Sequence, residues 1–303
     1  MLKFKSIDDL LDNTSEQELI NYLEEVIWDG KLVSPFDPTS KVYTLKDGSY
    51  MCSKTKKKFN IKVWTPFVKS RIPLRKWFRA VYMLFGQTGG ISSYQLSKLI
   101  GLSQRTAWYM LDRLRNSNDF FLINNAKKLK GVSEGDETYM GGENGNRHWD
   151  KKVPNCQGRN WKDKIPVLVM VERGGNAIAK VVPNVKQETL EPIIRANIEE
   201  GSIVNTDEWL AYKDLGKWYK HLVVNHRKKQ YAKGEASVNT AESFNACLKK
   251  GIYGTYYHIT RNHAQKYVSE VVMRYNLRKY KNEQEKFNLV LNSISIGKQY
   301  KKG

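Results

Sequence analysis

Residues 204–249 read VNTDEWLAYKDLGKWYKHLVVNHRKKQYAKGEASVNTAESFNACLK, and this stretch places two acids in contrasting settings. Asp207 closes a short apolar run, which is typical of a buried strand that delivers a carboxylate to the edge of an α/β sheet. Glu242 opens an amphipathic segment that predicts a helix. Lys249 follows seven residues later, nearly two helical turns, so it shares a face with Glu242. The stretch therefore predicts an acid on a strand opposite an acid and a cation on a helix.

A third acid lies upstream, in a segment that also has the pattern of a strand. Asp136 stands within GVSEGDETYM, and Gly141 and Gly142 end that run. Two further apolar runs flank a Gly-Gly turn and predict a hairpin. A helix with one apolar face, the strand of Asp207, another short strand and the Glu242 helix follow. The predicted segments are 131–140, 164–172, 176–185, 186–200, 203–207, 221–226 and 240–251.

This order, strand-strand-strand-helix-strand-strand-helix, resembles a ribonuclease-H-like fold, an α/β class with a mixed sheet and flanking helices. In that layout the acids of the first strand, the fourth strand and the late helix converge. Three such carboxylates can hold two divalent ions about 4 Å apart. Carboxylate oxygens suit Mg²⁺, or Mn²⁺ in its place. The sequence thus predicts a two-ion site made by Asp136, Asp207 and Glu242.

The N-terminal half predicts smaller elements. An acidic helical segment comes first, and short strands with a Lys-Asp-Gly turn then have the skeleton of a zinc-ribbon hairpin. A ribbon needs two C-x-x-C knuckles, but Cys52 is the one cysteine there, so zinc is not expected. The predicted divisions are a helical element at 1–30, the ribbon-like hairpin at 31–70, a helical DNA-binding domain at 71–118, the ribonuclease-H-like domain at 128–280 and a basic tail at 281–303.

The clearest local motif in this half is a helix-turn-helix pattern. Residues 92–100 predict a helix, Gly101 stands where a tight turn is needed, and Ser103 can cap a second helix. In such a unit the first turns of the second helix face the bases of DNA. An ordinary helical hairpin without DNA contact is the alternative. The side chains predicted to contact DNA are Gln104, Arg105 and Tyr109.

The charge points to a polyanionic partner. The chain carries a net charge of +20 with a pI of about 9.6, and nucleic acid is the common partner of such proteins. Residues 41–80 hold twelve bases and one acid, and residues 243–303 hold twelve bases and three acids, which predicts two separate DNA contacts. No run of about 18 apolar residues is present. A cytoplasmic location without membrane contact is expected, and three distant cysteines predict no disulfide.

Several blocks together resemble one known family, the DDE transposases of bacterial insertion sequences, and specifically the ISXO-like group. The blocks are GDETYMGG at 135–142, VNTDEWLAY at 204–212, VNH at 224–226, NTAESFNACLKKGIYGTYYHI at 239–259 and KYVSEVVMRYNLR at 266–278. By position, Asp136, Asp207 and Glu242 match the catalytic acids of the family, and Lys249 matches its following basic residue.

The resemblance implies metal-assisted cleavage of DNA at the ends of a mobile element, then attack of the freed 3′-OH on target DNA. Lys249 would contact a phosphate, with Lys250 and His226 as further DNA contacts. The partners would be double-stranded terminal repeats and target DNA, and two ends brought together imply at least a homodimer on DNA, associated with the bacterial nucleoid. Two alternatives stay open: a nuclease of the same fold without strand transfer, and a domesticated helix-turn-helix protein without catalysis.

Overall fold

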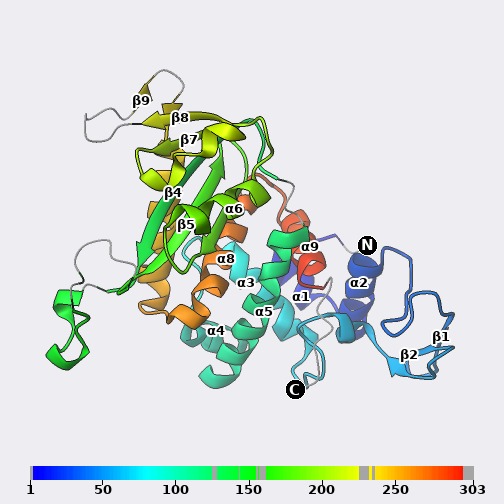
Figure 1. Ribbon diagram of the computed structural model, residues 1–303. Coiled ribbons are helices and arrows are strands. Elements are labelled where there is room, and N and C mark those ends of the chain that lie inside the picture. The colour runs from blue at the N-terminus through cyan, green and yellow to red at the C-terminus, as the bar shows by residue number, and fades with distance from the viewer. Residues whose placement is uncertain are drawn as a thin grey trace. The chain divides into compact units, whose positions relative to one another are not determined.

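The chain forms two compact units in the computed structural model (Figure 1). Of the helices that the structure describes, none combines the length and apolar character needed to cross a bilayer. The finer division of the N-terminal half stays a prediction. The described residues are 3–124, 128–142, 144–154, 156, 162–224, 232–233 and 236–295. The first unit comprises Met1–Gln87, Ile91–Asn124 and Leu277–Gly303, and the second comprises Thr88–Gly90 and Asn125–Asn276.

The first unit is built mainly from helices that pack around aromatic side chains. The ring of Phe287 lies 5.3 Å from that of Phe78 and 5.8 Å from that of Phe4, both edge to face. This geometry is the favoured one for aromatic pairs. These rings make one core from segments far apart in the sequence. The helices are α1 (Ile7–Asp12), α2 (Glu16–Trp28), α3 (Leu74–Gly86), α4 (Ser93–Ile100), α5 (Gln104–Asn124) and α9 (Glu283–Ser295).

The C-terminal segment differs from its prediction. Its basic composition suggested a tail over 281–303, but Glu283–Ser295 form helix α9. Phe287, Val290 and Leu291 are fully buried there. Val290 and Leu291 follow Phe287 by three and four residues, so the three side chains form an apolar helix face. A count of basic residues gives no information about such a face. The interpretation as a tail is therefore wrong for these residues, and 296–303 lie outside the described part.

Helices α4 and α5 form the pair that the helix-turn-helix pattern predicts. Ser92 caps α4 in a reciprocal capping box with Gln95. Gly101 ends the helix in the left-handed region at φ +60°, where a side chain would be strained. The hydroxyl of Ser103 then accepts the N–H of Thr106 at 3.2 Å at the start of α5. Local capping thus sets the turn, while DNA contact stays a prediction.

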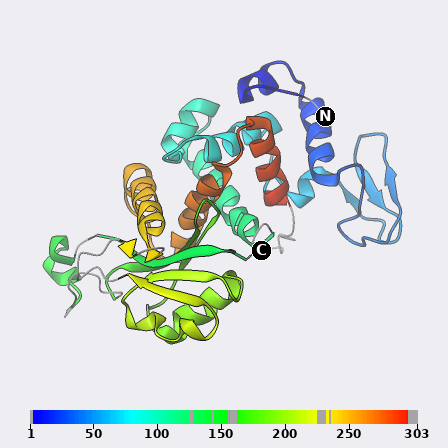
Figure 2. The same ribbon diagram turned by 90° about the horizontal axis from the view of Figure 1, so that it is seen from above.

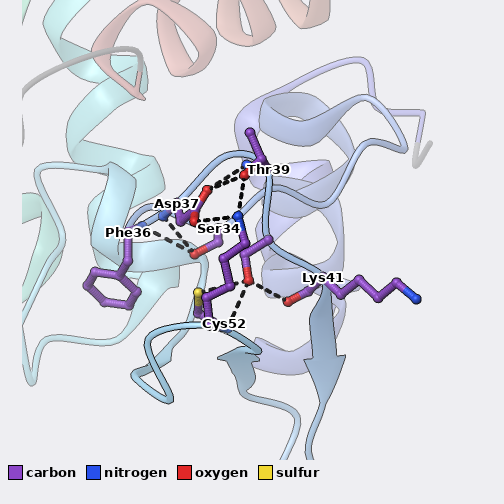
Figure 3. Close-up of polar contacts among 8 residues, drawn as sticks. Ser34, Phe36, Asp37, Thr39, Lys41 and Cys52 are labelled. Carbon is purple, nitrogen blue, oxygen red and sulfur yellow. Dashed lines mark hydrogen bonds and ion pairs between the residues drawn. The ribbon is translucent and has the colours of Figure 1, made fainter.

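The ribbon-like segment is held by hydrogen bonds among its turns (Figure 3). The hydroxyl of Ser34 accepts the backbone N–H groups of Phe36 at 3.2 Å and Asp37 at 3.4 Å. The thiol of buried Cys52 donates to the hydroxyl of Ser40 at 3.2 Å. The contact of Cys52 with Ser40 connects the loop before β1 with the end of β2. The elements are β1 (Val42–Thr44), β2 (Tyr50–Cys52), β3 (Lys58–Phe59) and η1 (Ile61–Trp64).

The second unit is built on a mixed five-stranded sheet in the order β6-β5-β4-β7-β8. The first three strands along the chain pair antiparallel, and β7 and β8 run parallel to β4. The α/β class and the order of the elements are confirmed, and they are compatible with a ribonuclease-H-like domain. The main elements are β4 (Val132–Met140), β5 (Ile165–Glu172), β6 (Ala177–Val181), α6 (Gln187–Asn197), β7 (Ile203–Asp207), β8 (Lys220–Val224), α7 (Asn239–Gly251) and α8 (Arg261–Leu277).

Short elements connect this framework. They are the 3₁₀ turns η2 (Asn144–Asn146), η3 (Trp149–Lys151), η4 (Leu210–Tyr212) and η5 (Leu215–Lys217), the strands β9 (Ala232–Lys233) and β10 (Ala236–Ser237), and the π-helix η7 (Ile252–Tyr256) that continues α7.

Helices cover both faces of the sheet (Figure 2). Strand β5 is buried along nearly its whole length, and alternate side chains serve opposite faces. Leu168 and Met170 join the core that α6 covers. On the other side, α8 protects the edge strand β6, because Gln265 and Asn276 bond to the backbone of Val181, Ala179 and Ala177 at 2.7 to 3.2 Å. The sheet is thereby a rigid support for side chains at its strand ends.

Candidate functional site

The register between β4 and β7 brings two of the predicted acids together. The parallel ladder ends where Glu134 pairs with Asn205. Asp136 and Asp207 each stand two residues beyond that pair, so equal steps along parallel strands carry them to the same level. Both carboxylates are partly exposed. Acidic side chains thus follow the end of the β4–β7 ladder on both strands.

A third carboxyl joins them, but it comes from the neighbour of Asp136. Oxygen atoms of Asp136, Glu137 and Asp207 all lie within 4.8 Å of one another, and this is the one group of its kind among the described residues. Asn245 on α7 donates to Asp136 Oδ2 at 2.7 Å, and the N–H of Trp209 donates to Asp207 Oδ1 at 3.0 Å. A set of carboxylate oxygens suits a hard divalent cation such as Mg²⁺ or Mn²⁺.

Glu137 has an environment unlike that of the other two acids. Its carboxyl accepts the hydroxyl of buried Tyr212. Burial raises the pKa of Glu137 to about 8, and the charges of Asp207 and Asp136 raise it further, against the lowering effect of the Tyr212 hydrogen bond. Without a cation nearby, this carboxyl therefore holds its proton at neutral pH. A cation in the group would replace that proton.

The raised pKa predicts how stability depends on pH in metal-free protein. The folded state keeps the Glu137 proton up to about pH 8, whereas the unfolded chain releases it near the ordinary value of 4.5. Between these values the folded state binds more protons, so its stability is expected to fall as pH rises. Denaturant midpoints measured in EDTA across this range test the slope.

Glu137→Gln, which stays uncharged, should remove that part of the slope. Glu188→Gln is the matched control, because the Glu188 side chain is 74% exposed on α6, and it should keep the slope. A slope that is the same in Glu137→Gln and wild type would assign it to another group.

Helix α7 is attached to the same strand by a buried acid. Glu134 is fully buried, and its carboxylate accepts the N–H groups of Thr240 at 2.7 Å and Ala241 at 3.0 Å. These are first-turn donors, which lack partners inside a helix. Arg173 Nε balances the charge of Glu134 at 2.7 Å, and a guanidinium nitrogen of Arg173 also donates to the carbonyl of Ser237 at 3.2 Å. The start of α7 is thereby held two residues along β4 from Asp136.

This attachment determines where Glu242 and Lys249 lie. Glu242, Asn245 and Lys249 are spaced by three and four residues, so they form one stripe along α7. Asn245 is the member that contacts Asp136, and the other two are exposed. Glu242 is not in the group of three acids; Glu137 takes that place among the residues described. The stripe nevertheless borders Asp136 through Asn245.

The remaining predicted residues lie elsewhere. Lys250 is exposed beside Lys249 in the last turn of α7. Gln104, Arg105 and Tyr109 are exposed on α5 of the first unit. His226 lies outside the described residues.

Sequence reasoning missed Glu134, Glu137, Asn245 and Tyr212. The signal for Glu134 was present, because it precedes Asp136 by two residues and so faces the same side of a predicted strand. Asn245 lies one helical turn after Glu242, which places it on the predicted face. Glu137 offered no such signal, since a strand pattern puts it on the opposite face from Asp136.

The comparisons with known proteins agree with this architecture. Residues 128–276 match the family described as the ISXO2-like transposase domain. An uncharacterised protein in the transposable element ISH50 of Halobacterium salinarum is 28% identical over 244 residues, covering 76% of this chain and 80% of the relative. An uncharacterised transposase-like protein of Haemophilus influenzae is 32% identical over 124 residues, covering 41% of this chain and 91% of the relative. The chain belongs to the DDE transposases of insertion sequences, in the ISXO2-like family.

Proposed function

We propose that this transposase binds the ends of its element, cleaves a DNA strand there and joins the freed 3′ end to target DNA. The group of Asp136, Glu137 and Asp207 at the end of the β4–β7 ladder is the observation that carries the proposal. Asn245, which shares a stripe of α7 with Glu242 and Lys249, contacts Asp136. Family membership is the second support, because DDE transposases use divalent metal ions.

The metal site of the proposal is made of oxygen donors alone. Asp136, Asp207 and Glu242 would hold two Mg²⁺ or Mn²⁺ ions, with Glu137 as an additional ligand once it loses its proton. When bound, such ions activate water and stabilise the leaving oxygen of a phosphodiester. Asn245 orients one of these acids, since its amide holds Asp136 Oδ2 at 2.7 Å. The backbone N–H of Trp209 does the same for Asp207 at 3.0 Å.

The cations of α7 would position the DNA. Lys249 stands on the stripe with Asn245 and suits a point contact with a phosphate next to the cleaved bond. Lys250 follows it, and His226 is the third residue proposed to contact DNA in this unit. These contacts would set the register of the strand without reading its sequence.

Recognition of the element ends is proposed for α5. Gln104 is held by a hydrogen bond from its Nε2 to Ser93 Oγ at 2.7 Å, which fixes its orientation at the start of the helix. Arg105 follows it, and Tyr109 lies one turn further, with the guanidinium of Arg113 5.4 Å from its ring centre. A protein that joins two ends would act as a homodimer or larger assembly on DNA, in the cytoplasm and at the nucleoid.

Cleavage and joining of a duplex that carries the element's own ends test the proposal. Wild type with Mg²⁺ or Mn²⁺ is expected to release a 3′-OH and join it to a second duplex, and EDTA should stop both steps. Glu242→Gln is expected to bind the ends but not cut them. Glu200→Gln is the matched control, because this exposed acid pairs with Arg195 away from the acidic group. Wild type that binds the ends and never cuts them under either metal would overturn the proposal.

A further inference from the structure

A pocket of about 510 Å³ adjoins the acidic group on the α6 side of the sheet. Its lining includes two of the three acids, Glu137 and Asp207, together with Val185, Lys186, Trp209 and Leu210. Pockets of about 300–1,000 Å³ are the usual size for small-molecule ligands. The volume therefore suits a ligand of the size of one nucleotide.

The wall of this pocket is an indole held in place by its polar ends. The backbone N–H of Trp209 donates to Asp207 Oδ1 at 3.0 Å, and its ring Nε1 donates to the carbonyl of Val185 at 3.2 Å. About half of Trp209 stays accessible to solvent, since the residue is 49% exposed. Leu210 beside it is 77% exposed. Exposed apolar side chains that are fixed next to an acidic site are typical of a surface that binds a ligand.

The chemistry of the lining favours a nucleobase over other ligands. Every base has a π face that can stack on an aromatic ring, and such stacking tolerates any sequence. The negative charge of Asp207 disfavours a phosphate inside the pocket, whereas a neutral base can donate an N–H group to a carboxyl oxygen of the lining. The exposed cation of Lys186 at the rim suits the backbone that would remain outside.

We infer that this pocket receives one unpaired nucleotide of the DNA next to the cleaved bond, with its base stacked on Trp209. The inference rests on the proposed function, because it uses the DNA strand that the acids would cut. Asp207 connects the two sites, because its carboxylate belongs to the acidic group and also accepts the backbone N–H of Trp209. A nucleotide withdrawn from the duplex would thereby hold the neighbouring phosphate at the acids.

Cleavage rates of full-length protein on paired and locally unpaired DNA test the inference. Trp209→Ala is expected to lower single-turnover cleavage of fully paired ends by about tenfold or more, the range found when a stacking residue is removed. Trp209→Phe should retain most of the rate, since it keeps an aromatic face. A single mismatch is placed at successive positions on each side of the cut, one position in each substrate. At the position of the nucleotide that enters the pocket, the mismatch should restore cleavage by Trp209→Ala, because the cost of unpairing is then removed.

The control is Trp149→Ala, which removes another exposed indole, 79% exposed in η3. Its rate should not respond to a mismatch at the position that rescues Trp209→Ala. A second readout is 2-aminopurine within a mismatch at that position in the Ca²⁺ complex. The base is already unpaired there, so fluorescence should be higher with Trp209→Ala than with wild type because the quenching ring is gone.

The outcomes separate the two proposals. If wild type cuts the ends but Trp209→Ala cuts equally well, or its defect is relieved at no position, the pocket inference is wrong and the transposase chemistry stands. A Trp209→Phe variant as slow as Trp209→Ala, with wild-type thermal unfolding, would also overturn it. If wild type cuts no DNA under any metal, the proposed function fails and the inference falls with it.

Discussion

Asp207→Asn is expected to lower the rate of DNA cleavage by about 1,000-fold or more, a loss of about 4 kcal/mol of transition-state stabilisation. The amide is the same size as the carboxylate but lacks the charge that a divalent ion requires. Its oxygen can still accept the N–H of Trp209, so the local backbone should be preserved. Single-turnover cleavage at saturating protein measures the loss, and titration with Mn²⁺ should show weaker binding of the ion.

Asp214→Asn is the control for this substitution. Asp214 belongs to the same segment of the chain, but its carboxylate binds Gln187 at 2.7 Å and Lys217 at 3.3 Å, outside the acidic group. Its rate and its Mn²⁺ affinity should match those of wild type. Cleavage by Asp207→Asn at the wild-type rate would show that the acids at the end of the β4–β7 ladder serve only the fold.

Glu134→Ala is expected to destabilise the second unit by about 3 kcal/mol, the low end of the cost of removing one partner from a buried ion pair. The low end applies because the Arg173 side chain is 32% exposed and water partly compensates for its lost partner. Two first-turn N–H groups of α7 also lose their acceptor. Unfolding by urea, followed by tryptophan fluorescence, measures the change.

Glu134→Gln separates the charge from the hydrogen bonds. Glutamine keeps one acceptor oxygen for the start of α7 but leaves Arg173 without its counter-charge, so an intermediate loss is expected. Cleavage by both variants should be reduced even where they are fully folded, because the stripe that carries Glu242 depends on this attachment. Urea midpoints equal to that of wild type in both variants would contradict the role of Glu134.

The order of elements was predictable because its signals are local. Apolar runs of strand length, a Gly-Gly turn and one-sided helices each lie within a short window, and together they define the mixed sheet. Asp136 and Asp207 were found in the same way, as acids in or at the end of such runs. The last helix was missed, because the basic residues of 281–303 outweighed the apolar spacing of Phe287, Val290 and Leu291.

The sequence alone determined the class of fold, the two strand acids and the likeness to insertion-sequence transposases, since these depend on patterns within short segments. The tertiary structure decided which acids meet. Glu137 joins the group only because β4 stops pairing with β7 before it and Tyr212 approaches it from another part of the chain. Glu134 became the anchor of α7 only once a segment more than 100 residues away was brought to it. Burial and neighbouring charges set both roles, with like charges beside Glu137 and an opposite charge beside Glu134, and this packing joins distant segments.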